Sequence, residues 1–298
     1  MGESGTIMHW TGSWNQASSP TTFSLFYVWG TGGRAWAAGQ LGTLLQYSSG
    51  NWSRVANPAE QTQDGFAALW ASSPADIWVV GSRGTILHYD GATMPTLVTP
   101  APTTMHLGGI WGASASNVYV GAYASPGGQM GTVVHYNGSA WSALSGLPTD
   151  LACGRAAGTG SNDVWVLANK TLTTDSRGLP LDLLGRALHY DGRVWSTVVP
   201  QPAESQSSYT SIFVSGTNDV WLLGQSGANH IGTILHWDGA AWSGNVSPTT
   251  TTLHGIYGSG PRDIWAVGEQ GTVLHFDGSA WSQPAFITSG SLFGVWVP

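Results

Sequence analysis

Histidines recur at one equivalent position of a repeated unit in this chain, and histidine suits acid–base catalysis and metal binding near neutral pH. The six copies are His9, His88, His135, His189, His236 and His275, with Gln46 in the remaining unit. Copies in successive units lie apart rather than around one ion, and a glutamine in the same place preserves hydrogen bonding but not metal ligation. We therefore interpret this histidine column as a hydrogen-bonding element between strands, not as a metal or catalytic site.

Carboxylate or amide side chains also recur, each at the start of a predicted strand: Asp76, Asn117, Asp163, Asp219 and Asp263. Such side chains accept backbone N–H bonds in turns, so we expect them to be structural. A calcium loop needs several oxygen ligands at alternating spacing, and no such run occurs. Cys153 is the only cysteine. We predict no metal and no cofactor.

The elements that position these residues are seven copies of one unit. The units begin at glycines spaced 37 to 54 residues apart, which is the period of propeller blades: Gly5, Gly42, Gly84, Gly131, Gly185, Gly232 and Gly271. Segments such as 76–81 (DIWVVG) and 84–91 (GTILHYDG) are short, β-branched and aromatic, which is typical of strands. Asp-Gly pairs such as the one at 90–91 predict tight hairpins.

Each unit therefore predicts four antiparallel strands: an inner strand, a second, a third and an outer one. The inner strand ends in an aromatic residue in every unit except 153–157 (CGRAA). Closing the repeated sheets into a ring leaves no free sheet edges between blades. We predict one all-β domain over residues 1–298, a seven-bladed β-propeller without helices.

The predicted ring closes with an incomplete blade. Residues 1–19 supply its third and outer strands and 292–298 its inner strand, so its second strand is largely missing. The chain is then either part of a longer one or has a strand-sized gap in its last blade. We expect that a neighbouring chain can add a strand there and so form an oligomer.

The segment 263–283 (DIWAVGEQGTVLHFDGSAWSQ) resembles the tectonin-type propeller repeat and also the Asp-box repeat of sialidase-like and photosystem-assembly propellers. The resemblance covers essentially the whole chain. It implies a propeller fold, and it implies functions that include sugar binding, catalysis and assembly. An aromatic residue such as Tyr89 stands where the Asp-box serine is expected.

Tryptophans form a second column, on the second strands. They are Trp36, Trp78, Trp165, Trp221 and Trp265. A position repeated in every blade must satisfy packing in every blade, so we interpret these rings as core rather than as sugar platforms.

Ligand contacts are expected where the copies differ. By strand parity, the second-to-third and outer-to-inner connections share one side, the loop face, and they carry the long variable segments. The other two connections are short and share the opposite side, the turn face. Variable loops on a rigid ring are where binding is usually placed. The candidate ligand residues are Arg155, His254, Phe26, Tyr27, Phe293, His106, His230, Lys170, Asp175 and Arg177. Arg155 on an inner strand suits either an anionic ligand or an internal ion pair.

Composition excludes several classes. A net charge of −7, with only 9 lysines and arginines, argues against nucleic-acid binding. No apolar run is long enough to predict a membrane span. The sparse arginines do not form the cluster that a sialidase uses to hold a carboxylate. We expect an extracellular or cell-surface location in a bacterium, with the cytoplasm as the alternative.

These observations predict a noncatalytic, lectin-like propeller that recognises a glycan through the loop face. The alternative is a protein–protein interaction scaffold or a repeat module of a larger secreted or surface protein. A sialidase-like hydrolase is a weaker third hypothesis.

Overall fold

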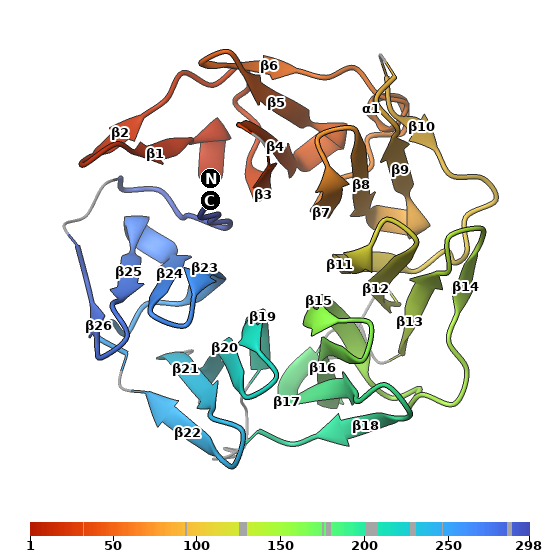
Figure 1. The fold of residues 1–298 in the computed structure, drawn as a ribbon, viewed down its shortest axis with the longest axis vertical. Coiled ribbons are helices and arrows are strands. Elements are labelled where there is room, and N and C mark those ends of the chain that lie inside the picture. The colour runs from red at the N-terminus through yellow and green to blue at the C-terminus, as the bar shows by residue number, and fades with distance from the viewer. Residues whose placement is uncertain are drawn as a thin grey trace.

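The computed structural model describes residues 1–31, 33–92, 94–124, 130–174, 176, 180–200, 208–226, 231–245, 247–284 and 288–298. These residues form six four-stranded antiparallel sheets and one two-stranded sheet. The sheets stand around a central axis, and the first strand of each four-stranded sheet faces the centre (Figure 1). Consecutive strands along the chain are neighbours in every sheet, as in propeller blades.

The blades follow chain order. Blade one comprises β3 (Leu25–Thr31), β4 (Arg34–Gly39), β5 (Leu44–Ser48) and β6 (Asn51–Arg54). Blade two comprises β7 (Phe66–Ser73), β8 (Asp76–Gly81), β9 (Ile86–Tyr89) and β10 (Thr96–Leu97). Blade three comprises β11 (His106–Ser114), β12 (Asn117–Tyr123), β13 (Gly131–Tyr136) and β14 (Trp141–Ala143).

The remaining blades have the same order of strands. Blade four comprises β15 (Ala152–Gly160), β16 (Asp163–Thr174), β17 (Pro180–Tyr190) and β18 (Trp195–Val198). Blade five comprises β19 (Ser208–Gly216), β20 (Asp219–Ser226), β21 (Ile231–Trp237) and β22 (Trp242–Asn245). Blade six comprises β23 (Leu253–Gly260), β24 (Asp263–Gly268), β25 (Val273–Phe276) and β26 (Trp281–Ser282).

The terminal sheet, β1 (Met8–Trp10) with β2 (Trp14–Gln16), has only two strands. An incomplete blade was predicted at this position, but the predicted seven-bladed ring is only partly supported: the described residues form six complete blades and this small sheet, and not a clearly closed ring of seven. The turn at η1 (Glu3–Gly5) precedes β1. Gly2 makes a single antiparallel bridge to Leu292.

The expectation of no helix was also wrong. One turn of α-helix, α1 (Ala59–Thr62), and three further 3₁₀ turns are present: η2 (Gln40–Gly42), η3 (Ser82–Gly84) and η4 (Glu269–Gly271). The 3₁₀ turns explain the marker glycine in four of the seven units, at Gly5, Gly42, Gly84 and Gly271, each of which has a positive φ. Gly84 has a φ of 73°, and a Cβ there would lie 1.8 Å from the carbonyl oxygen of Thr103. Only glycine accepts that conformation and that approach.

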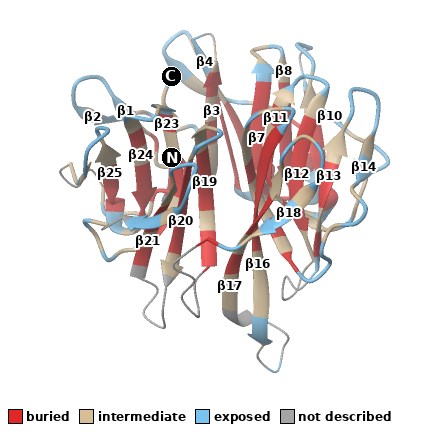
Figure 2. Cartoon of the chain, turned by 60° about the horizontal axis from the view of Figure 1, so that its bottom comes forward, coloured by how far each residue is buried: buried red, intermediate tan, exposed pale blue. Residues whose placement is uncertain are grey.

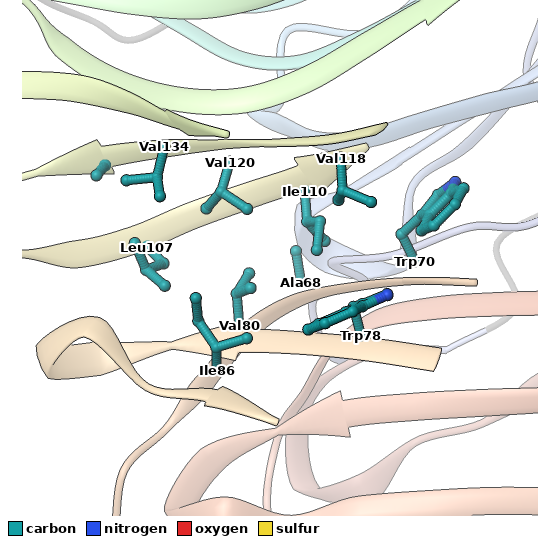
Figure 3. Packing of buried hydrophobic residues seen from close by; sticks show 11 residues of the cluster. Ala68, Trp70, Trp78, Val80, Ile86, Leu107, Ile110, Val118, Val120 and Val134 are labelled. Carbon is teal, nitrogen blue, oxygen red and sulfur yellow. The ribbon is translucent and has the colours of Figure 1, made fainter. Parts of the chain in front are cut away.

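The core lies between neighbouring blades. One cluster joins Trp78, Val80 and Ile86 of blade two to Val120 and Val134 of blade three, all of them buried (Figure 3). Inward-facing apolar residues alternate with outward ones along each strand, so each sheet packs one face on each neighbour. Four further buried clusters join other neighbouring blades, and two more lie between the terminal sheet and blades one and six.

The predicted division into two faces agrees with the strand connections. The β16–β17 hairpin extends beyond the other strands on the loop face, whereas the inner-to-second turns gather on the opposite side (Figure 2). No helix in the described part of the chain is long and apolar enough to cross a membrane.

Candidate functional site

The histidine column forms a repeated side-chain cluster, seen clearly in blade five. Asp219 stands at the start of β20, and its Oδ1 accepts hydrogen bonds from His236 Nε2 at 2.6 Å and from Trp221 Nε1 at 2.9 Å. The Ser215 hydroxyl donates to the other carboxylate oxygen. The Trp221 and His236 rings stack with centroids 4.0 Å apart. The cluster thus ties the inner-to-second turn to the third strand.

The same contacts recur around the ring. A histidine Nε2 lies 2.7 to 2.9 Å from an aspartate oxygen in three more blades, in the pairs His88–Asp76, His189–Asp163 and His275–Asp263. Each of these histidines stacks on a second-strand tryptophan, at 3.8 to 4.1 Å between centroids: Trp78, Trp165 and Trp265. Four second-strand tryptophans are buried: Trp36, Trp78, Trp165 and Trp221.

This geometry indicates that the cluster has a structural role rather than one in proton transfer. The serine or threonine hydroxyl bonds to the carboxylate and not to the imidazole, so it lacks the base that activates a nucleophile. Burial raises the pKa of Asp219, but hydrogen bonds from His236 and Ser215 more than offset it and leave that pKa below its ordinary value. The aspartates were expected to accept backbone N–H bonds of the turn; in the described residues their partners are side chains instead.

The exceptions within the chain support the same interpretation. In blade three, Asn117 replaces aspartate and its oxygen lies 2.7 Å from His135 Nε2. Burial lowers the pKa of His135, consistent with a neutral ring beside a neutral amide. In blade one, Arg34 and Gln46 take the two places together, so the carboxylate and the imidazole are lost as a pair.

Arg155 lies on β15, the inner strand of blade four, and its side chain reaches toward the inner strand of blade one. Its Nε donates to the carbonyl oxygen of Thr210 at 3.2 Å, and its guanidinium carbon lies 5.0 Å from the ring centroid of Tyr27 on β3. β15 and β3 belong to non-adjacent blades, so the arginine crosses the channel. No carboxylate of the described residues lies within ion-pairing distance of it. Burial lowers the pKa of Arg155 and Tyr27 opposes that shift, but a guanidinium stays charged.

A cavity of about 250 Å³ opens beside Arg155, toward the turn face. Its polar lining includes Arg155 and Ser211. Its aromatic lining comes from the repeated aromatic position of the inner strands, which lies within each strand and not at its end as predicted: Trp29, Trp70, Trp111, Phe213 and Tyr257. The sequence analysis noted these aromatics as a repeat feature but did not assign them to a site. The inner-strand pattern could have indicated these residues, because an aromatic residue occupies this position in every complete blade except blade four, which has Ala157.

The inner-strand aromatics also interlock the blades. A Cβ on Gly112 of β11 would lie 2.5 Å from the Trp70 ring of the preceding blade, and one on Gly158 of β15 would lie 2.9 Å from Trp111. Each of these tryptophans therefore covers a glycine of the next inner strand. After Ala157, which has no ring, the matching position of the next inner strand is Val214.

Three predicted ligand residues meet at the loop-face mouth of the channel. The rings of Phe26 and Phe293 lie 5.5 Å apart, and His254 lies 5.3 Å from Phe293. Burial lowers the pKa of His254, while the charges of Glu269 and Glu3 raise it and that of Arg155 lowers it. This mouth therefore has an aromatic rim with two carboxylates close by.

The other predicted residues are not part of that group. His106 stacks on Tyr123 of its own blade at 5.7 Å. Lys170 forms an exposed ion pair with Asp150 at 2.9 Å. Asp175, Arg177 and His230 lie outside the described residues. Among the residues that the structure does describe, no group of three or more histidine, cysteine or acidic side chains could hold a metal ion.

A second cavity, of about 330 Å³, lies beside the terminal sheet. Met8 and His9 of β1 line one side of it, Val295 and Trp296 another, and Tyr47 and Trp52 of blade one a third. The sequence predicted an incomplete blade here but could not show that a cavity opens between these groups.

No family model and no curated protein matches the chain. Solved structures do match its fold. YCF48 bound to D1 peptide aligns with a TM-score of 0.63 at 14% identity, covering 89% of this chain and 81% of that one. A virginiamycin B lyase from Staphylococcus aureus in complex with quinupristin aligns with a TM-score of 0.63 at 12% identity, covering 88% and 84%. The Aleuria aurantia lectin with a fucosylated N-acetylglucosamine aligns with a TM-score of 0.53 at 15% identity, covering 87% and 93%.

These likenesses define the class of the protein as a β-propeller. At such low identity they show the fold alone, because one fold supports many functions. The neighbours include a peptide-bound propeller, a lectin and a lyase, so they are consistent with binding and do not specify the ligand.

Proposed function

We propose that this protein is a noncatalytic, lectin-like binding propeller whose ligand is a sugar acid held in the central channel. The observation that carries the proposal is the Arg155 guanidinium, which faces a cavity with no carboxylate of the described residues within ion-pairing distance. Arg155 is partly buried, and a charge partly withdrawn from water without a counter-ion is unfavourable. A ligand carboxylate would neutralise it through two parallel N–H···O bonds.

The lining of the cavity fits the rest of such a ligand. Trp29, Trp70 and Trp111 offer aromatic faces that can pack against the C–H groups of a sugar ring, and Ser211 offers a hydroxyl. Ligand pockets usually span about 300 to 1,000 Å³. At about 250 Å³, this cavity is suited to one terminal sugar rather than a chain of several.

The channel geometry favours entry from the turn face. The charges of Glu3 and Glu269 act on His254 at the loop-face mouth, where they would repel an anion. The cavity beside Arg155 lies nearer the turn face, and inner-strand residues such as Trp29, Trp111 and Tyr257 line it. Binding through the loop face stays a prediction from sequence; the site proposed here is reached from the opposite side.

The test is binding of sugar acids and their neutral counterparts, measured by saturation-transfer NMR and calorimetry. We expect glucuronic acid or N-acetylneuraminic acid to bind in the millimolar range or tighter and glucose to bind at least tenfold more weakly. Arg155→Gln should remove the difference, and added salt should weaken the acid. Arg193→Gln, at an exposed position, is the matched control. Equal binding of acidic and neutral sugars, or none of either, would contradict the proposal.

The second candidate function is protein binding, because the cavity beside the terminal sheet is largely apolar and bordered by strands. The backbone contacts beside this cavity also bear on the number of blades. Leu292 and Gly294 pair with Gly2 and Met1 in the same register as Leu253 and Gly255 of β23 pair with β24. We propose on this basis that segment 292–298 and the terminal sheet together occupy a seventh blade position.

A further inference from the structure

Blade one differs from the other complete blades at the start of its second strand. In three of those blades the aspartate at this position accepts a hydrogen bond from an indole Nε1, in the pairs Trp165–Asp163, Trp221–Asp219 and Trp265–Asp263. Blade one has Arg34 in place of the aspartate. The strand register supports this equivalence, because Arg34 lies opposite Thr31 on β3 as Asp76 lies opposite Ser73 on β7.

Trp36 of the same strand has an indole nitrogen without an acceptor. The residue is 1% exposed, and its Nε1 is buried with no hydrogen-bond partner in the described part of the chain. Its ring lies 5.2 Å from the Tyr89 ring of blade two at 48°, close to the 4.8 Å and 52° between Trp221 and Phe276. Trp221 directs its Nε1 to Asp219, so the same ring placement directs the Nε1 of Trp36 to the position of the missing carboxylate.

Two further donors belong to this position. Gln46 lies opposite Trp36 on β5, as His236 lies opposite Trp221 in blade five. Among the described residues, the Gln46 side-chain amide makes no hydrogen bond and Arg34 forms no ion pair. One cation and two N–H donors therefore surround a position that holds a carboxylate in four other blades.

We propose that this position of blade one binds a carboxylate group from another molecule. One carboxylate oxygen accepts from Trp36 Nε1 and from the Gln46 amide, as Asp219 accepts from an indole and an imidazole. The Arg34 guanidinium pairs with the other oxygen and neutralises its charge. The residues of the sugar-acid site take no part in this binding.

The complete blades indicate why a carboxylate suits the position. In blade five a planar group with two oxygens fits between the indole of the second strand, the imidazole of the third strand and a serine hydroxyl. A tetrahedral sulfate or phosphate is bulkier than this group. The carboxylate can belong to a small organic acid or to an acidic side chain of a peptide, because both present the same two oxygens.

The position can be reached from solvent. Gly33 and Arg34 are exposed in the turn that leads into β4, on the turn face of the ring. A buried N–H without an acceptor is unfavourable, so a ligand oxygen that reaches Trp36 Nε1 removes that penalty. Binding therefore gains from the indole as well as from the charge of Arg34.

The probe is sodium acetate, titrated at pH 7 into the isotope-labelled chain of 298 residues, with sodium chloride keeping the ionic strength constant. The readout is the indole N–H signal of Trp36 in two-dimensional NMR, assigned with Trp36→Phe. We expect this signal to move downfield and to saturate with acetate, because hydrogen bonds to a carboxylate are short and strong. Sodium sulfate at the same ionic strength should leave it almost unchanged.

The indole signal of Trp78 is the internal control. Its Nε1 also lacks a partner, but Asp76 already occupies the carboxylate position of that blade. Acetate should therefore leave the Trp78 signal unchanged.

Variants of Arg34 test the position directly. Arg34→Gln should weaken acetate binding about fivefold, the upper range for an exposed ion pair. Arg34→Asp should move the Trp36 signal without acetate and abolish its response to acetate, because it supplies the carboxylate from within the chain. Arg193→Gln, at another exposed position, is the matched control. Circular dichroism verifies that the variants fold.

A second titration identifies the source of the carboxylate. It uses aspartate capped at both ends by acetyl and amide groups, with the capped asparagine as its neutral counterpart. Tighter binding of the capped aspartate than of acetate would assign the site to a peptide side chain, and equal binding would assign it to small acids. The capped asparagine should not bind.

Three outcomes would overturn the proposal: a Trp36 signal that does not respond to acetate at hundreds of millimolar, an equal response to sulfate, or undiminished binding by Arg34→Gln. Arg155→Gln should not change the acetate response of Trp36, and Arg34→Gln should not change the preference for sugar acids. Failure of the sugar-acid proposal and failure of this one are therefore distinguishable.

Discussion

In four blades, the aspartate at the start of the second strand accepts several hydrogen bonds at one carboxylate. Asp219 accepts from an imidazole, an indole and a hydroxyl, and its partners belong to three segments of one blade. Removing a partner from a partly buried polar group costs more than making the bond contributes. This asymmetry accounts for the joint replacement of aspartate and histidine in blade one by Arg34 and Gln46.

We predict that Asp219→Asn lowers the free energy of unfolding at pH 7 by about 1.5 to 3 kcal/mol, the scale of hydrogen bonds to a charged group. The carboxyl pKa is lower in the folded protein than in the unfolded chain. Its contribution is therefore present above the ordinary pKa of about 4 and is lost as the pH falls through the lower, folded value. Urea unfolding of both proteins at pH 7 and pH 3 tests this, and an unchanged difference at pH 3 would refute it.

The side chains of neighbouring inner strands are complementary in size. Trp70 of β7 covers Gly112 of β11, and Trp111 of β11 covers Gly158 of β15. A ring over a bare backbone lets neighbouring blades approach closely at the narrow centre, where a larger residue would push them apart.

We predict that Gly112→Ala destabilises the protein by about 1 to 3 kcal/mol, the usual cost of overpacking. The added methyl group would meet Trp70 at 2.5 Å. Gly160→Ala, on another inner strand, meets nothing within 4 Å and should change stability by no more than about 0.5 kcal/mol. Thermal unfolding of both variants measures the difference in stability between them. Equal effects of the two substitutions would contradict the close packing of Trp70 on Gly112.

At the scale of the whole molecule, stability is uneven around the ring. A two-stranded sheet with one unpaired edge buries less backbone than a four-stranded blade, and such regions open at lower free energy. We predict faster amide exchange in residues 7–17 than in 263–276, measured by hydrogen–deuterium exchange. Protection of 7–17 equal to that of blade six would contradict this account.

Much of this architecture could be predicted because it is local. The repeat period, the Asp-Gly hairpins and the Gly-Thr markers define the blades, and departure from the repeat singled out Arg155. The contact of Arg155 with Tyr27 could not be predicted, because it joins non-adjacent blades across the axis. Strand parity assigned the connections to the two faces correctly. It could not predict on which side of Arg155 a cavity remains, since that depends on how the inner-strand rings pack.

The pairing of Ala157 with Val214 has a consequence for how the chain folds. A ring of similar repeats can assemble with a blade one position out of order, and such misassembly is a characteristic failure of repeat proteins. Docking blade four's ringless inner strand beside a glycine would leave a void, and docking a tryptophan beside Val214 would overlap atoms. This mismatch distinguishes the junction between blades four and five from the junctions at which a tryptophan covers a glycine, so a blade docked out of order at this junction is expected to be less stable.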